Sequence, residues 1–369
     1  MSQQLSGLVV TPAGTVPGRI RFGESISAIE PLGGPLPDRF IVPGFIDVHV
    51  HGGGGGDTMD GADGVRTMAQ FHLQHGTTTM LPTTVTNPVS ELLEVLAGFS
   101  AARAAGGELP DLPGVHLEGP FISPERLGAQ PPFATEPRPE PVSELLAPGL
   151  IRVVTLAPEL PGAAAAAHQF ARAGVRVSLG HSSDDGSATR ELLDTLASSG
   201  AVTAFTHLFN AMGGIEARRP GLATLALLRE ESYAEVILDR LHLHDDVLRL
   251  VLSSKPGRVM AITDAMRAAG LGDGPTELGG QAVTVTEGQA RLADGTLAGS
   301  VLTMDQALRN ALAIGLDWAA AVELTSAAPA RYLGLSDRGS LEPGRRADLV
   351  VFDADLNVSS VWLRGQQLV

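Results

Sequence analysis

Short apolar runs alternate with amphipathic or Ala/Leu-rich stretches along most of the chain from about residue 41. The apolar runs predict eight strands, at residues 45–51, 78–82, 114–118, 151–156, 176–181, 202–207, 234–238 and 259–264. Helical patterns lie between most of them, for example at 64–75, 89–105, 162–173 and 187–199. Strands separated by helices form parallel βαβ units. Eight such units fit a TIM-type (β/α)8 barrel, an α/β fold, better than an open doubly wound sheet.

The two ends of the chain have a different pattern, of short β-type pieces separated by Pro and Gly turns. We expect residues 1–43 and 335–369 to pair into a small β-sandwich domain, with the catalytic barrel at 44–334. Within the barrel, residues 279–297 predict a hairpin that turns near residues 287–288. The proline-rich segment 119–148 predicts a long loop after the third strand, and loops of this length are usually functional or disordered.

Composition excludes several classes of protein. The formal net charge of −15 argues against nucleic-acid binding, which requires a basic surface. The absence of cysteine excludes disulfides, zinc–thiolate sites and thiol nucleophiles. The N-terminal segment lacks the basic and apolar regions of a signal peptide, and no apolar run reaches about 18 residues. We therefore expect a cytoplasmic protein without a membrane partner.

The first predicted strand ends in the most informative pair of residues, His49 and His51. Side chains alternate along a strand, so these two imidazoles point to the same side. Together they can hold one divalent cation. Since a His-x-His pair is also common as an ordinary polar strand face, its interpretation depends on the rest of the chain.

Four more residues of metal-ligand type end predicted strands three, five, six and eight. They are Glu118, His181, His207 and Asp264. Each alone has an ordinary explanation, such as a turn cap for an aspartate. In a barrel, however, the carboxyl ends of all strands meet at one mouth. The six residues together therefore predict a divalent-metal centre there, with His116 as a candidate to orient a ligand from behind.

Several motifs resemble a known family. They are Pro-Gly-Phe-Ile-Asp-Val-His-Val-His-Gly at 43–52, His-Leu-Glu-Gly-Pro-Phe at 116–121, Gly-His-Ser at 180–182, Thr-His-Leu-Phe-Asn-Ala-Met at 206–212, Ile-Thr-Asp-Ala-Met at 262–266 and Leu-Ala-Gly-Ser at 297–300. The first motif and the strand-end histidines are similar to the amidohydrolase superfamily. The whole set resembles its N-acetylglucosamine-6-phosphate deacetylase family, over nearly the full chain.

The only lysine gives independent support to this resemblance. Many amidohydrolases bridge two metals with a carbamylated lysine at the end of the fourth strand. The predicted fourth strand, 151–156, contains none, and Lys255 lies before the eighth strand. Glu118 then has to supply the bridging or anchoring carboxylate, as the resemblance implies. This disfavours a dihydroorotase or a hydantoinase.

The resemblance implies a role for each candidate residue. Glu118, His181 and His207 would hold the principal divalent ion, which is Zn or alternatively Fe, Mn, Co or Ni. Because His49 and His51 are both present, a second ion sharing Glu118 is expected, giving one or two ions per subunit. A bound cation lowers the pKa of water to near 7. Asp264 would accept the proton of that water and deliver it to the leaving amine.

Nine positions are implied in substrate binding. They are Gly119, Gln130, Asn210, Ala211, Arg218, His242, Leu297, Ala298 and Gly299. In the family, the counterparts of Asn210, Ala211, Arg218 and His242 bind the sugar phosphate, with the arginine reaching a neighbouring subunit. We therefore expect a homodimer that removes the acetyl group from N-acetylglucosamine 6-phosphate.

Two residues depart from the family pattern. Gln130 stands where a histidine near the substrate carbonyl is common, and glutamine is never cationic. Arg240 stands where a glycine is more usual. Either change leaves open another N-acetylated amino sugar as substrate. Hydrolysis of a cyclic amide, deamination of a purine, and a non-enzymatic scaffold are the alternatives from other classes.

Overall fold

The computed structural model describes residues 3–34 and 38–369. All eight predicted segments form parallel strands of a (β/α)8 barrel. They are β5 (Phe45–Val50), β8 (Thr77–Pro82), β9 (Val115–Glu118), β10 (Ile151–Leu156), β11 (Arg176–Leu179), β12 (Thr203–Phe205), β13 (Tyr233–Ile237) and β14 (Val259–Ile262). The apolar runs identify these strands because both faces of each are covered, so nearly every residue in them is buried.

The barrel consists of two hydrogen-bonded sheets. One has six strands in the order β14-β13-β12-β11-β10-β9, and the other pairs β5 with β8. Backbone hydrogen bonds join them at both seams: the Thr84 N–H donates to the His116 carbonyl at 3.0 Å, and the Asp264 N–H donates to the His49 carbonyl at 2.9 Å. The second bond brings the ends of the first and last strands together.

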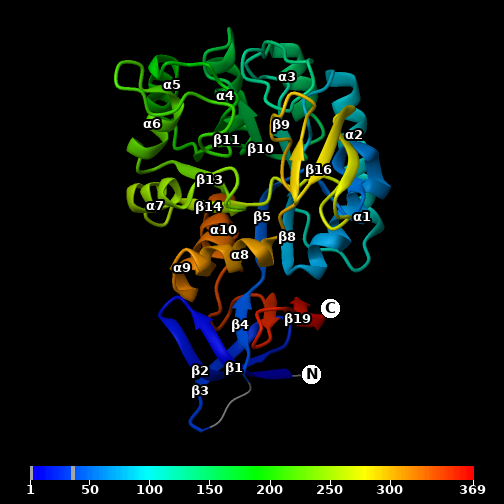
Figure 1. Ribbon diagram of the computed structural model, residues 1–369, viewed down its shortest axis with the longest axis vertical. Helices are drawn as coiled ribbons and strands as arrows, with labels where there is room; N and C mark the ends of the chain where they lie inside the picture. Colours follow the sequence, from blue (N-terminus) through cyan, green and yellow to red (C-terminus); the bar gives the residue numbers. More distant parts are fainter. Residues whose placement is uncertain (1–2, 35–37) are drawn as a thin grey trace.

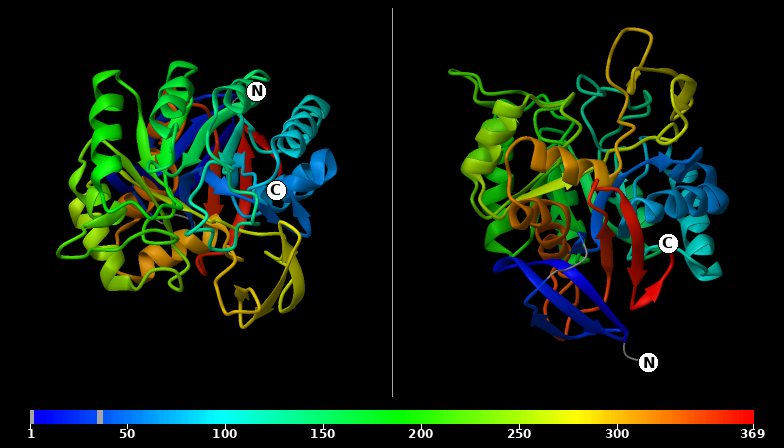
Figure 2. Two further views of the ribbon diagram at one scale, coloured as in Figure 1. Left: turned by 90° about the horizontal axis from the view of Figure 1, so that it is seen from above. Right: turned by 60° about the horizontal axis from the view of Figure 1, so that its bottom comes forward.

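Helices cover the outside of these strands, except that α9 (Trp318–Val322) lies between the barrel and the sheet formed by the two ends of the chain (Figure 1). They are α1 (Gly61–Gln74), α2 (Val89–Ala105), α3 (Pro139–Leu146), α4 (Ala163–Arg172), α5 (Ser187–Ser198), α6 (Gly221–Leu228), α7 (Asp245–Ser254), α8 (Met304–Ala313), α9 (Trp318–Val322) and α10 (Ala328–Leu333). Seen from above, the helices α1 to α7 lie at the periphery (Figure 2, left). Among the described residues, no helix is long and apolar enough to cross a membrane.

The predicted hairpin belongs to a larger element. Its two strands are β16 (Gln281–Thr286) and β17 (Gln289–Arg291), and a third strand, β15 (Gly274–Leu278), pairs antiparallel with β16. The sequence prediction therefore began one strand too late. The polar alternation of β15 is weak, and its turn into β16 uses two glycines with positive φ, Gly279 and Gly280. This sheet (yellow in Figure 2) lies at one edge of the barrel.

Strands from both ends of the chain form one further sheet. Its order is β20-β19-β18-β4-β1-β2-β3, from β1 (Gln3–Thr11), β2 (Gly14–Phe22), β3 (Ile26–Pro31), β4 (Phe40–Pro43), β18 (Leu349–Phe352), β19 (Val358–Leu363) and β20 (Gln366–Gln367). The strands form one continuous hydrogen-bonded run that closes on itself: the rings of Phe22 in β2 and Trp362 in β19 lie 5.2 Å apart in a shared core that also includes Ile41, as expected of a small β-sandwich. It lies below the barrel in Figure 1. We propose the domain division 1–43 with 335–369 against 44–334.

Candidate metal centre

Two predicted ligands, His181 and His207, and the predicted catalytic Asp264 lie just past their strands, in a strained backbone conformation. The φ angles of His181, His207 and Asp264 are 46°, 28° and 48°. Left-handed conformations cost non-glycine residues about 1–3 kcal/mol and persist where the surroundings fix them, often at active sites. They also explain why β11, β12 and β14 end two residues earlier than predicted: the chain turns at the ligand-type residue. The turn directs each side chain into the barrel mouth.

One group of ligand-type atoms comprises Glu118, His181 and His207, all buried. The Nε2 atoms of the two histidines lie 3.0 Å apart, and they are 3.2 Å and 3.0 Å from the same Glu118 oxygen, Oε1. Three atoms that each offer a lone pair thus converge on one point. Imidazole and carboxylate ligands in this number suit a divalent transition-metal ion.

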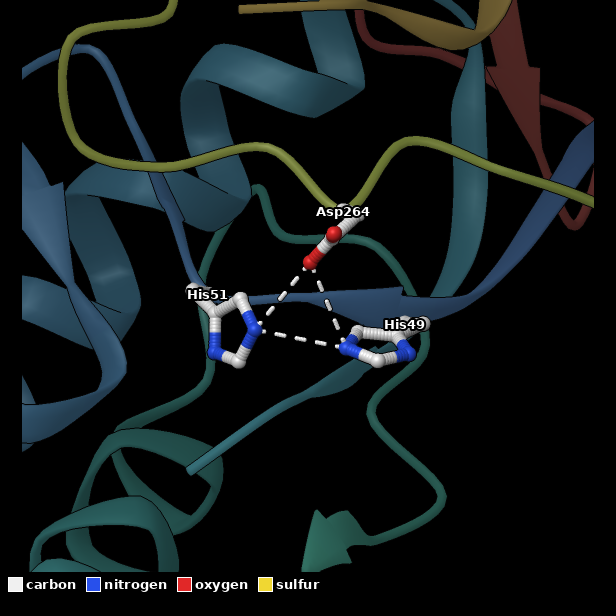
Figure 3. Close-up of side chains that lie close together, drawn as sticks. All are labelled: His49, His51 and Asp264. Atoms are coloured by element: carbon white, nitrogen blue, oxygen red, sulfur yellow. Dashed lines mark hydrogen bonds and ion pairs between the residues drawn. The ribbon is translucent and has the colours of Figure 1, made fainter. Parts of the chain in front are cut away.

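A second group comprises His49, His51 and Asp264 (Figure 3). Oδ1 of Asp264 lies 3.2 Å from Nε2 of His51 and 3.4 Å from Nε2 of His49. The other oxygen of Glu118, Oε2, lies 3.3 Å from Nε2 of His51. Glu118 therefore lies between the two groups: Oε1 faces His181 and His207 and lies 3.6 Å from Nε2 of His49, while Oε2 faces His51. The donor set fits a divalent ion at either group, as expected from the sequence.

The histidines and carboxylates of the centre shift one another's pKa values, because opposite charges lie close together. Burial alone would lower the pKa of His51, but hydrogen bonds to Asp264 and Glu118 raise it to about 9. Burial alone would raise the pKa of Glu118, yet the charges of His49 and His181 bring it well below its usual value. Without a cation, protons on His49 and His51, both with a raised pKa, balance the neighbouring carboxylates. A divalent ion has to displace such protons, so its affinity increases with pH.

Asp47 fixes the position of the His49–His51 strand end. Its Oδ1 accepts from the His49 N–H at 3.2 Å and its Oδ2 accepts from the Thr263 hydroxyl at 2.5 Å. This fully buried carboxylate thereby ties β5 to β14, next to Asp264. Burial raises the pKa of Asp47 to about 7, in spite of these hydrogen bonds. His116, a candidate to orient a ligand, instead binds the Val48 carbonyl and the Thr155 hydroxyl.

A cavity of about 380 Å³ opens over the two groups. The predicted residues that line it are His51, Glu118, Gln130, His181, His207, Asn210, Ala211, His242, Asp264, Leu297 and Gly299. His49 lies beneath it, and Gly119, Ala298 and Arg218 do not line it. Gly299 (φ 62°) packs where a Cβ would come 2.8 Å from the Asp264 carbonyl, so only glycine fits there.

The cavity has further lining residues that the sequence did not indicate. They are Gly128, Ala129, Ile237, Leu278, Arg291 and Thr296. Arg291 and Thr296 belong to the β15–β17 sheet and the loop that follows it, and this sheet folds over the mouth only through tertiary contacts. Gln281 shows one of these contacts, since its amide donates to the Ala129 carbonyl at 2.7 Å. In the sequence, an arginine shortly before a Gly-Thr turn does not by itself indicate a residue that lines a cavity.

Both residues that depart from the family pattern make specific contacts. The Gln130 amide donates to Oε2 of Glu118 and accepts from the Thr86 N–H at 2.6 Å. Both ends of the side chain are therefore engaged within the protein. Arg240 has a φ of 64°, which explains a glycine at this position elsewhere, and its guanidinium forms two hydrogen bonds to Asp245, at 2.7 Å and 3.0 Å. Its side chain does not line the cavity.

The strand-end ligand groups of a (β/α)8 barrel, with a carboxylate shared between them, define the class of protein. The amidohydrolase family model matches residues 40–229 and 245–368, and the chain belongs to this family.

Within this family, the chain is similar to deacetylases of phosphorylated amino sugars. The chain is 37% identical over 350 residues to an N-acetylgalactosamine-6-phosphate deacetylase of Escherichia coli O157:H7, covering 92% of each chain. It is 37% identical to an N-acetylglucosamine-6-phosphate deacetylase of Bacillus subtilis, covering 89% of this chain and 84% of the relative. A mutant Mycobacterium smegmatis N-acetyl-D-glucosamine-6-phosphate deacetylase, solved in complex with N-acetyl-D-glucosamine-6-phosphate, superimposes with a TM-score of 0.92 at 35% identity, covering 100% of this chain and 99% of that one.

Proposed function

We propose that this chain is a metal-dependent hydrolase that removes the acetyl group from N-acetyl-D-glucosamine 6-phosphate, giving glucosamine 6-phosphate and acetate. The observation that carries the proposal is the arrangement of Glu118, His181 and His207 beside His49, His51 and Asp264 under one cavity. The family, the deacetylase relatives and the absence of a lysine at the fourth strand all agree with it.

A divalent cation held there would supply Lewis acidity and make water nucleophilic near neutral pH. The role of Asp264 follows from its charge and position. Burial opposes ionisation, but the charge of His49 and the hydrogen bond to His51 lower the pKa of Asp264 to about 2. Asp264 is therefore a carboxylate at neutral pH, able to accept a proton from the attacking water. It then returns that proton to the departing nitrogen, so that the leaving group is an amine.

We propose two ions per subunit, because the Glu118 carboxylate contacts histidines of both groups, Oε1 at His207 and Oε2 at His51. Zinc is the first candidate, with Fe, Mn, Co and Ni as alternatives, since imidazole and carboxylate ligands suit all of them.

N-acetylgalactosamine 6-phosphate is the second candidate substrate, because one relative of 37% identity is an N-acetylgalactosamine-6-phosphate deacetylase. Acetate release from the gluco, galacto and manno 6-phosphates, and from the unphosphorylated sugars, tests the proposal. We expect phosphorylated N-acetylglucosamine to be hydrolysed with the highest kcat/KM. Hydrolysis of cyclic amides or purines, with none of these sugars, would contradict it.

His242 is proposed to bind the phosphate as a cation. Burial would lower its pKa, but the hydrogen bond and charge of Asp239, whose Oδ2 lies 2.7 Å from Nδ1, raise it above the usual 6.5. The positive charge therefore persists to higher pH and is lost as pH rises through the raised value. KM for a phosphorylated sugar should increase over that range.

Asp239→Asn should move this KM increase to lower pH, because the amide keeps an acceptor for the backbone but removes the charge that raises the pKa of His242. The ratio of variant to parent KM, measured from pH 6 to 9, cancels the titration of the substrate itself. KM for unphosphorylated sugar should not change. Asp246→Asn, next to the exposed His244, is the matched control. An unshifted KM profile in Asp239→Asn would remove His242 from the phosphate site.

We propose a homodimer in which Arg218 reaches the partner's cavity. Arg218 is exposed in the loop before α6 and does not line the cavity of its own chain. Arg218→Ala should raise KM for phosphorylated sugar at least tenfold and leave the unphosphorylated sugar unaffected. A mixed dimer of one Arg218→Ala chain and one Asp264→Asn chain contains one intact site. At low substrate concentration, its activity should therefore exceed the summed activity of the two variant homodimers. Mixed dimers no better than that sum would contradict a shared site.

A further inference from the structure

Besides Asp47, a second buried acidic side chain of the barrel belongs to neither group that faces the cavity. Glu235 lies in the middle of β13, whose five residues are all buried, and its own exposure is 0%. A buried carboxylate is costly unless it is paired or hydrogen-bonded. Its Oε2 lies 3.0 Å from Nδ1 of His49 and accepts from the His207 N–H at 3.3 Å. Both contacts are to proposed metal ligands.

The contact to His49 determines what the ring offers to the cavity. The other ring nitrogen, Nε2, lies 3.3 Å from Nε2 of His51 and 3.4 Å from Oδ1 of Asp264. An imidazole that ligates through Nε2 must carry its proton on Nδ1, and a carboxylate at Nδ1 fixes that tautomer and the orientation of the ring. His116 packs against the same ring, at 4.6 Å between centroids, but both its nitrogens bind elsewhere.

We infer that Glu235 is a positioning residue of the metal centre: it holds His49 with the proton on Nδ1, so that Nε2 serves as a ligand for a cation in the group His49, His51 and Asp264. This inference rests on the metal dependence of the proposed function but not on its substrate. The negative charge also makes the ring a stronger ligand. Loss of such a partner typically lowers metal affinity 10–100-fold.

Titration with Co²⁺ tests the inference without any turnover. Chelator-treated protein is titrated while visible absorbance and bound cobalt are recorded. We expect two Co²⁺ ions per chain in the parent. Glu235→Leu should lower the affinity for the Co²⁺ ion held by His49, His51 and Asp264, called the second ion, 10–100-fold. Glu235→Gln should lower this affinity less, because the amide oxygen still accepts from Nδ1 of His49. Ser232→Ala is the matched control: it removes a buried hydrogen bond to Thr203 just before β13 and should leave both ions unchanged.

A double-mutant cycle of Glu235→Leu with His49→Ala separates the positioning of His49 by Glu235 from a general effect of the substitution on the barrel. If Glu235 acts through His49, the single ion left in His49→Ala should bind equally well, within twofold, after Glu235→Leu is added. The inference would be overturned if Glu235→Leu lowered the Co²⁺ affinity of His49→Ala a further tenfold. It would also be overturned if the parent bound only one Co²⁺, or if Glu235→Leu alone left the affinity for the second ion unchanged. Because cobalt binding is read directly, failure of the deacetylase proposal would leave this result interpretable.

Discussion

Asp264→Asn is expected to lose at least 10²–10⁴-fold in kcat while the fold is retained. Asparagine preserves the size of the side chain but cannot accept the proton of water, and general acid–base groups contribute a factor of this order. The parent carboxylate is ionised at neutral pH and lies 3.2 Å from Nε2 of His51. Steady-state kinetics on N-acetylglucosamine 6-phosphate, with circular dichroism and thermal melting for the fold, measure the effect.

Asp185→Asn provides the control for this variant. Asp185 is exposed, follows the His181 turn and accepts from the Ser187 N–H. Its replacement should leave kcat within about twofold, since surface substitutions are usually small in effect. Turnover of Asp264→Asn close to that of the parent would require a different proton acceptor and would exclude the assigned role.

Glu118→Gln is expected to have a comparable effect for a different reason. Its two oxygens contact His181, His207 and His51, so the neutral amide weakens both groups of ligands together. We expect bound metal to fall below one ion per chain and kcat/KM to fall about 10³-fold or more, which corresponds to about 4 kcal/mol. Metal analysis and kinetics on the same preparation give both numbers.

The control for Glu118→Gln is another carboxylate near the same mouth. Glu159 accepts hydrogen bonds from the Ser182 hydroxyl and the Ser183 N–H at 2.7 Å each, directly after His181. Glu159→Gln retains an acceptor and should keep both ions. A Glu118→Gln protein with full metal content and full activity would show that the shared carboxylate is unnecessary.

Much of the fold and the site could be predicted because the signals are local. Strand position follows from apolar runs, and ligand-type residues at strand ends follow from side-chain alternation and the geometry of barrels. Residue type and position along the chain were therefore enough to predict the group that comes together in the structure: His49, Glu118, His181, His207 and Asp264. The left-handed turns at His181, His207 and Asp264 were not predictable, because tertiary contacts impose them against the local preference.

What the sequence did not indicate depends on contacts between distant segments. Glu235 lies 186 residues from His49, and the only sequence signal for it is a charged residue inside an apolar strand. The amide of Gln130 is engaged with Glu118 and Thr86, which no spacing rule predicts. Arg291 reaches the cavity because the β15–β17 sheet folds over the barrel mouth.

The most direct test of the central claim is graded addition of Zn²⁺ to chelator-treated protein, with bound zinc and acetate release from N-acetylglucosamine 6-phosphate measured on each sample. The account predicts that acetate release increases with bound zinc from near zero and that Asp264→Asn stays inactive throughout the titration. Full acetate release by protein that holds less than about a tenth of an ion per chain would contradict it. Zinc-loaded parent protein that releases no acetate would contradict it equally.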